Sequence, residues 1–229
     1  MKEEVTNPWL EIPLEEYEEH MSSPTVAQAQ YLTAVLKGLV QSLSPSSVAV
    51  LGCAGGNGFE MLSAYDLRRV VGVDMNPDYI AAARKRYEHR FSTLDLFCYD
   101  FLSRECLFEP VDFVFAGLIF EYIDVEESLQ RIKGFLVPNG YLGVVLQLPS
   151  ATVPHVTPSP FKSLMKLENF MKLVSPTDFE NQARSSGFVI RSANSRTLET
   201  GKAFYEGIFQ WNKKEELERS TKKPQNKRS

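Results

Sequence analysis

Residues 46–58 read SSVAVLGCAGGNG, and this stretch decides the class of fold. The apolar run from Val48 to Leu51 is short and unbroken, which is typical of a buried parallel strand. Four glycines lie within the seven residues after this run, and glycine permits positive φ angles and a close approach of the backbone to a ligand. In an open parallel sheet such a turn lies at the carboxyl end of the first strand, where ligands bind. The stretch therefore predicts an α/β fold with a ligand site at its first turn.

Strand-like and helix-like segments alternate after this turn. The pattern predicts strands over 69–74, 94–100, 111–116, 141–148, 188–193 and 203–211, with helices over 77–90, 125–136, 163–173 and 176–187. Asn76 is a good helix cap and Pro77 fits the first helical position. Such alternation indicates βαβ units. We expect a doubly wound sheet of seven strands, mostly parallel, with helices on both faces.

Three further segments flank or interrupt this core domain, which we place at residues 46–211. Residues 1–45 predict an N-terminal helical cap, in two helical pieces broken at Ser23-Pro24. Residues 149–174 predict a lid-like insertion, because four prolines between 149 and 162 exclude a helix or a central strand. Residues 212–229 form a basic tail. Within the first two segments, we expect residues 14–30 and 149–172 to roof the ligand site and to select the substrate.

The charge and cysteine content exclude several classes of protein. The net charge is −4, which argues against a nucleic-acid partner. No apolar run approaches the roughly 18 residues that span a bilayer, and the acidic start of the chain does not resemble a signal peptide. The three cysteines match no zinc spacing and no disulfide framework. We expect a soluble cytoplasmic protein with three buried cysteines, no metal site and no membrane partner.

Two acidic residues follow the glycine turn at predicted strand ends. Asp74 lies 22 residues after Gly52, where an acid is placed to bind a ribose diol. Asp100 ends the next predicted strand in the same way. Dinucleotide binding is the competing interpretation, but the G-x-G-x-x-G spacing fails, because Ala54 and Asn57 stand at its third and sixth positions when counted from Gly52.

At this point residues 46–148 resemble the class I S-adenosylmethionine-dependent methyltransferases. VAVLGCAGGNG is similar to the first motif of that family, although Val50 stands where an acid is usual and Ala54 where a glycine is usual. The resemblance implies a Rossmann-like fold whose closing strands form an antiparallel hairpin. It also implies S-adenosylmethionine as the cofactor, with its ribose at Asp74 and its adenine near Asp100. The cofactor contacts it implies are Gly52, Cys53, Ala54, Gly56, Asp74, Met75, Asp100, Phe101, Leu118 and Glu121.

Methyl transfer from a sulfonium needs alignment of the reactants and exclusion of water more than it needs acid catalysis. A general base is required only for an oxygen acceptor or a protonated amine. The candidates for a base or an orienting group are Tyr17, His20, Tyr122 and His155. We predict methyl transfer to a small-molecule acceptor. A non-catalytic cofactor- or nucleotide-binding module on the same fold and an NAD-dependent oxidoreductase remain alternatives, and the sequence leaves the acceptor and the oligomeric state open.

Overall fold

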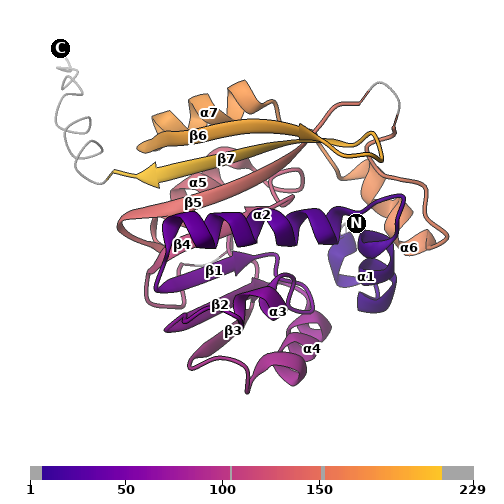
Figure 1. Ribbon diagram of the computed structural model, residues 1–229. Coiled ribbons are helices and arrows are strands. Elements are labelled where there is room, and N and C mark those ends of the chain that lie inside the picture. The colour runs from indigo at the N-terminus through magenta and orange to yellow at the C-terminus, as the bar shows by residue number, and fades with distance from the viewer. Residues whose placement is uncertain (1–6, 104, 151–152, 213–229) are drawn as a thin grey trace, which may run out of the picture.

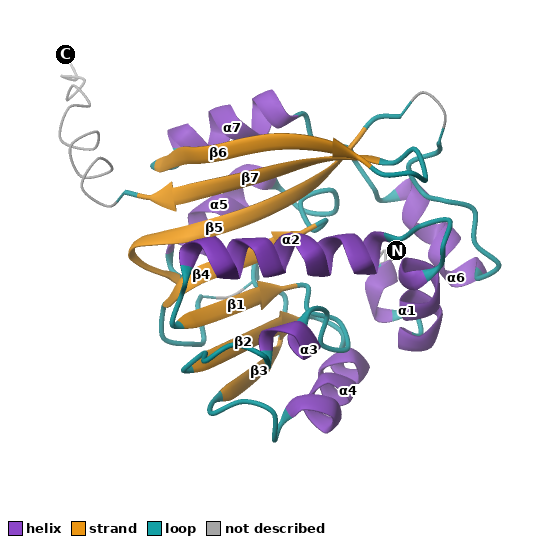
Figure 2. Ribbon diagram, viewed as in Figure 1, coloured by secondary structure: helices purple, strands orange, loops and turns teal. Residues whose placement is uncertain are grey.

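The computed structural model describes residues 7–103, 105–150 and 153–212. Except for Asn212, the basic tail predicted at 212–229 lies outside the described residues. Seven strands form one sheet in the order β3-β2-β1-β4-β5-β7-β6 (Figures 1 and 2). The strands are β1 (Ser47–Leu51), β2 (Arg69–Asp74), β3 (Leu94–Cys98), β4 (Val111–Gly117), β5 (Leu136–Leu148), β6 (Phe188–Thr197) and β7 (Ala203–Trp211).

Strand pairing confirms the doubly wound architecture. β1 pairs in parallel with β2 on one side and with β4 on the other, so the order of connection reverses beside β1. Ligands bind at such a reversal point, outside the carboxyl ends of the strands. β7 runs antiparallel between β5 and β6, and it forms the antiparallel closing hairpin with β6. The fold is therefore the Rossmann-like sheet that the sequence predicted.

Helices cover both faces of the sheet, because both faces are apolar. The helices are α1 (Leu14–Ser22), α2 (Gln28–Leu43), α3 (Phe59–Leu62), α4 (Pro77–Tyr87), α5 (Val125–Lys133), α6 (Lys162–Met165) and α7 (Pro176–Ser185), with 3-10 turns η1 (Pro8–Leu10) and η2 (Lys166–Asn169). Leu36 of α2 and Phe59 of α3 are buried in the hydrophobic cluster on one face. Leu129 of α5 and Phe179 of α7 are buried in the cluster on the other. Figure 2 shows α2 and α3 in front of the sheet and α5 and α7 behind it.

Several element ends differ from the prediction, and local chemistry explains them. β3 ends at Cys98, so Asp100 lies in the turn after the strand, where its side chain accepts a hydrogen bond from the Leu102 N–H at 2.9 Å. Asp favours such turns because its side chain bonds the backbone two residues on. The predicted helix at 163–173 is shorter and divides into α6 and η2.

The three cysteines are free thiols, but they are not all buried as predicted. Cys53 is buried, Cys106 is half-buried and Cys98 is exposed at the end of β3. Cys98 ends β3, an edge strand that pairs with β2 on one side and with no described strand on the other. None of the helices in the described ranges is both long enough and apolar enough to cross a membrane.

The two flanking segments meet at the carboxyl edge of the sheet. Figure 1 shows α1 and α6 side by side at the strand ends. Ile12, Leu164 and Leu167 form a small buried cluster between the segments. An ion pair of 2.5 Å joins the Lys166 ammonium to the Glu11 carboxylate across the same contact. Segments about 150 residues apart in sequence are thus packed together directly above the predicted ligand site.

Candidate active site

The glycine turn folds the chain back over the end of β2. Gly52 has a φ of +65° and Ala54 a φ of +45°, so the backbone is in the left-handed region twice within three residues. The Gly52 and Cys53 N–H groups both donate to the Val73 carbonyl, at 2.8 and 3.1 Å. These bonds fix the turn against the neighbouring strand end, beside Asp74.

Asp74 connects the two strand-end turns. One carboxylate oxygen accepts from the Ala54 N–H at 2.9 Å, and the other accepts from the Asn76 N–H at 2.9 Å. Burial raises the pKa of the Asp74 carboxyl, although these two backbone N–H groups oppose the rise. Each carboxylate oxygen can accept a further hydrogen bond. Asp74 therefore holds the loop and still offers acceptors to a ligand.

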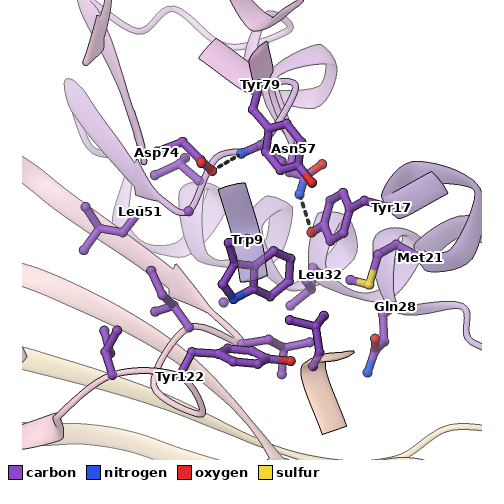
Figure 3. Close-up of a pocket in the computed structure, with 18 of the residues that line it drawn as sticks. Trp9, Tyr17, Met21, Gln28, Leu32, Leu51, Asn57, Asp74, Tyr79 and Tyr122 are labelled. Atoms are coloured by element: carbon purple, nitrogen blue, oxygen red, sulfur yellow. Dashed lines mark hydrogen bonds between the residues drawn. The ribbon is translucent and has the colours of Figure 1, made fainter. Parts of the chain in front are cut away.

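A cavity of about 460 Å³ opens above these turns. Its volume lies within the range of roughly 300–1,000 Å³ that is common for small-molecule sites. The predicted site residues that line it are Gly52, Ala54, Asp74, Met75, Asp100, Phe101, Leu118, Tyr17, His20, Tyr122 and His155. Figure 3 shows Asp74 on one side of this cavity and Gln28 on the other, with Trp9 between them.

Three predicted cofactor contacts, Cys53, Gly56 and Glu121, are not among the residues that line the cavity. Cys53 is fully buried beneath the turn. A Cβ added to Gly72 would lie only 2.9 Å from the Cys53 Sγ, so this thiol packs closely against β2. A Cβ on Gly56 would lie 2.4 Å from the Tyr87 ring, so this glycine allows close packing against α4. The motif therefore contains packing positions as well as positions that face a ligand.

Glu121 is buried and lies outside the cavity lining. Its Oε1 accepts from the Gln147 N–H at 2.6 Å, and its Oε2 has no hydrogen-bond partner among the described residues. Burial raises the pKa of Glu121 to about 7. The residue links the segment after β4 to β5 and supports the cavity from outside.

The N-terminal segment closes the cavity on one side. The Asn57 amide of the glycine turn donates to the Tyr17 hydroxyl at 3.0 Å (Figure 3). The Asn76 side chain, which caps α4, donates to the Trp9 carbonyl at 2.8 Å. The Trp9 ring meets the Tyr122 ring edge to face, with centroids 5.0 Å apart. Burial raises the pKa of the Tyr17 hydroxyl. This segment is therefore bonded to the turns that form the floor.

A second ion pair strengthens this attachment. The Arg86 guanidinium of α4 contacts the Glu18 carboxylate at 2.5 Å and donates to the Gly55 carbonyl at 3.1 Å. Because both partners are partly exposed, we assign the pair a modest energy. The pair matters because it fixes positions: through Arg86, α4 is joined both to α1 and to the glycine turn.

The sequence interpretation missed the polar end of the cavity, which is formed by Gln28, Gln147 and Lys202. The Lys202 ammonium donates to the His155 carbonyl at 3.0 Å and to the Gln147 amide oxygen at 3.4 Å. The Gln28 amide donates to the same Gln147 oxygen at 3.1 Å. Gln147 had a detectable signal, since it is a polar residue inside the apolar run of β5. Lys202 had none, because it follows Gly201 in an ordinary hairpin turn.

The two candidate histidines differ in their surroundings. His20 is half-buried, and burial together with the nearby Lys202 charge lowers its pKa. Its imidazole is therefore largely neutral at pH 7, and one of its two ring nitrogens is unprotonated and can accept a proton. His155 is exposed, and its backbone carbonyl, not its ring, makes the hydrogen bonds to Gln147 and Lys202.

Comparisons with known proteins agree with this geometry. Residues 49–144 match the family model described as a methyltransferase domain. No curated protein sequence matches the chain. Among solved structures, the chain is similar to the N-methyltransferase NodS from Bradyrhizobium japonicum WM9 in complex with S-adenosyl-L-homocysteine, with 17% identity, a TM-score of 0.67, and coverage of 89% of this chain and 98% of that one.

Two further solved structures show how widely this fold is used. The [4+2]-cyclase SpnF is 12% identical with a TM-score of 0.62, covering 81% of this chain and 82% of that one. A putative sarcosine dimethylglycine methyltransferase from Galdieria sulphuraria is 13% identical with a TM-score of 0.58, covering 82% and 86%. At these identities the structural similarity establishes the fold, and the domain match carries the assignment. These findings agree with the resemblance seen in the sequence: residues 49–144 match a methyltransferase domain, and the chain shares its fold with the methyltransferases named above.

Proposed function

We propose that the cavity holds S-adenosylmethionine over the strand ends and a small-molecule methyl acceptor beneath the roof formed by residues 7–32 and 153–171. The cofactor supplies an electrophilic methyl group on a sulfonium centre. Asp74 would bind the ribose diol, and Asp100 with Phe101 would lie at the adenine, as the family resemblance implies. The site fits such a ligand because Asp74 retains free acceptor capacity and Gly52 exposes backbone to the cavity.

One observation carries this proposal: a single cavity extends from the Asp74 turn to the enclosed end beside Gln28. The reacting groups of a methyl transfer must meet in line and away from water. Aromatic side chains of the N-terminal segment wall the middle of the cavity, including Trp9 and Tyr17. A cavity of this volume, roofed on one side by η1 and α1 and on the other by α6 and η2, suits two small molecules and not a polymer.

His20 is the side chain that we propose as proton acceptor when the methyl acceptor requires one. It lines the cavity, and its lowered pKa keeps the imidazole neutral at pH 7. Tyr17 and Tyr122 also line the cavity, but burial raises the pKa of both hydroxyls, so they donate hydrogen bonds and do not accept protons. We assign these two tyrosines an orienting role.

Calorimetric titration with S-adenosylmethionine, S-adenosylhomocysteine and NAD tests the cofactor assignment. We expect the first two to bind with micromolar affinity and NAD not to bind. Binding of NAD alone would support the oxidoreductase alternative. Transfer of a labelled methyl group to any member of a metabolite panel separates an enzyme from a silent binding module.

We also propose a cytoplasmic location and no nucleic-acid partner. The three free cysteines suit a reducing compartment. The net charge of −4 does not favour binding to a polyanion. Fractionation of cells that express the tagged protein, and a gel-shift assay with RNA and DNA, test the two statements.

A further inference from the structure

A buried ammonium group without a counter-charge lies at the polar end of the cavity. Lys202 is 3% exposed, and both of its hydrogen-bond acceptors, the His155 carbonyl and the Gln147 amide oxygen, are neutral. No carboxylate within the described ranges forms an ion pair with it. An ammonium has three N–H donors, so one remains for a ligand. Burying such a charge is costly unless it is paired, which makes a ligand the natural source of the missing charge.

Lys202 keeps its charge at neutral pH despite its burial. Burial lowers the pKa of its ammonium to about 8. A group with this pKa is mostly protonated at pH 7. The cavity therefore presents a positive charge, and this charge contributes to lowering the pKa of His20.

Two further hydrogen-bond donors belong to residues that line the same cavity as Lys202. The Thr157 hydroxyl is buried and has no partner among the described residues. The Gln28 amide uses one N–H on Gln147, which leaves its second N–H unassigned. A charged donor and two neutral donors in the lining of one cavity are a set that a negatively charged acceptor group would satisfy.

We propose that Lys202, Thr157 and Gln28 form a subsite for a carboxylate of the methyl acceptor. The inference rests on the proposed function and narrows its substrate class. Lys202 is the single lysine or arginine among the cavity-lining residues that the structure describes. One positive charge matches a carboxylate better than a dianionic phosphate ester.

The rest of the lining defines the remainder of the acceptor. Trp9, Tyr122 and Leu164 line the same cavity with apolar surface. Gln28 lies across the cavity from Asp74 (Figure 3), so a carboxylate held here points the rest of the molecule toward the cofactor end. The acceptor class is therefore a small carboxylic acid with an apolar or aromatic body, whose nucleophilic atom is remote from the carboxylate.

Matched acid and amide probes test this subsite on the S-adenosylhomocysteine-saturated protein. The probes are phenylacetate, 3-phenylpropanoate and 4-phenylbutanoate, each paired with its primary amide, with dissociation constants from ligand-observed NMR. We expect the best acid to bind at least about tenfold more tightly than its amide, the scale of a hydrogen bond to a charged group. Lys202→Met should remove this preference, and Lys37→Met, on the exposed face of α2, should retain it.

A second variant keeps the test independent of any folding defect in Lys202→Met. Thr157→Val preserves shape and removes only the hydroxyl, and we expect it to weaken acid binding about threefold. S-adenosylhomocysteine affinity is measured for every variant as the check on the fold. If the cofactor product binds but acids bind no better than amides, the subsite is wrong and the proposed function stands. If the product itself does not bind the wild-type protein, the proposed function fails. Tighter binding of phenyl phosphate than of every acid would overturn the carboxylate assignment.

Discussion

The two ends of the cavity are built in different ways. The end beside Asp74 comes from turns that directly follow β1, β2 and β3, and each turn lies within a few residues of its strand. The end beside Lys202 combines residues from α2, from β5, from the segment after β5 and from the turn that precedes β7. The first end follows from strand order alone, since carboxyl ends of parallel strands meet at one edge. The second exists only after distant segments have packed together, and it is the end that we expect to select the acceptor.

Gly56→Ala should have the largest effect, and it should act on the cofactor end. The residue has a φ of +101°, and the new Cβ would lie 2.4 Å from the Tyr87 ring. Backbone strain and overpacking each cost about 1–3 kcal/mol, so we expect the free energy of unfolding to fall by about 3 kcal/mol. Urea denaturation measures this change. The cause is packing against α4, and not occupation of the cofactor space.

Gly38→Ala is the matched control for this substitution. Nothing lies within 4 Å of the Cβ position of Gly38, which is inside α2. Alanine should therefore stabilise the helix by about 0.5–1 kcal/mol. Equal effects of the two substitutions would contradict the packing role of Gly56.

Glu121→Gln should change how the free energy of unfolding depends on pH. Glu121 accepts a hydrogen bond from the backbone of Gln147, a residue of the acceptor end. The folded-state pKa of Glu121 is raised to about 7 from 4.5. Its protonation therefore stabilises the fold fully below pH 4.5, and this contribution is lost as the pH rises through 7. At 1.36 kcal/mol per unit, the loss is about 3 kcal/mol. The Gln variant has no ionisable group here and keeps its stability as the pH rises. The difference in unfolding free energy, variant minus wild type, should therefore increase between pH 4.5 and 7.5.

Glu168→Gln serves as the control, because this glutamate is exposed on η2. We expect this exposed substitution to change the free energy of unfolding by less than about 0.5 kcal/mol. Parallel pH profiles for wild type and Glu121→Gln would show that Glu121 ionises normally in the folded protein.

Asp74→Ala should weaken binding of S-adenosylhomocysteine by about 1.5–3 kcal/mol, the scale of hydrogen bonds to a charged group. The substitution also removes the acceptor for the Ala54 N–H, which loosens the glycine turn. Calorimetry gives the affinity, and Asp66→Ala, at an exposed position between α3 and β2, is the control. A folded Asp74→Ala protein with wild-type affinity would remove Asp74 from the cofactor site.

Tyr17→Phe should have the smallest effect, because it removes one neutral hydrogen bond between the glycine turn and α1. The lost bond from the Asn57 amide contributes about 0.5–1.5 kcal/mol. Hydrogen exchange with and without S-adenosylhomocysteine should show weaker protection of residues 14–22 in the variant. Tyr65→Phe, whose side chain lies outside the cavity lining, should leave that protection unchanged.

Much of the fold was predictable because its signals are local. The apolar run of β1 and the Asn76-Pro77 start of α4 each specify their element within a few residues. Element ends were less predictable. Asp100 looked like the last residue of a strand, but β3 stops at Cys98, and the Asp100 side chain forms a turn of its own.

The residues of the candidate site likewise divide into those placed by local signals and those placed by tertiary packing. Gly52, Asp74 and Asp100, which the sequence predicts as cofactor contacts, all line the cavity, because strand ends bring them together. Cys53, Gly56 and Glu121 do not line it, because each packs against another part of the fold: Cys53 lies beneath the turn, Gly56 lies against Tyr87 and Glu121 bonds to β5.

The sequence by itself determined the sheet, its reversal point and the glycine turn, because hydrophobic periodicity and turn chemistry act between near neighbours. The sequence also predicted the two segments that roof the cavity, but only the tertiary structure decided how they pack together and which residues form the polar end of the cavity. Lys202 is an unremarkable hairpin residue in sequence, and it becomes a buried charge only when the His155 carbonyl and Gln147 come to lie around it. Contacts across such long sequence separations leave no local pattern, because the residues next to each partner in the sequence do not specify which distant residue it will contact.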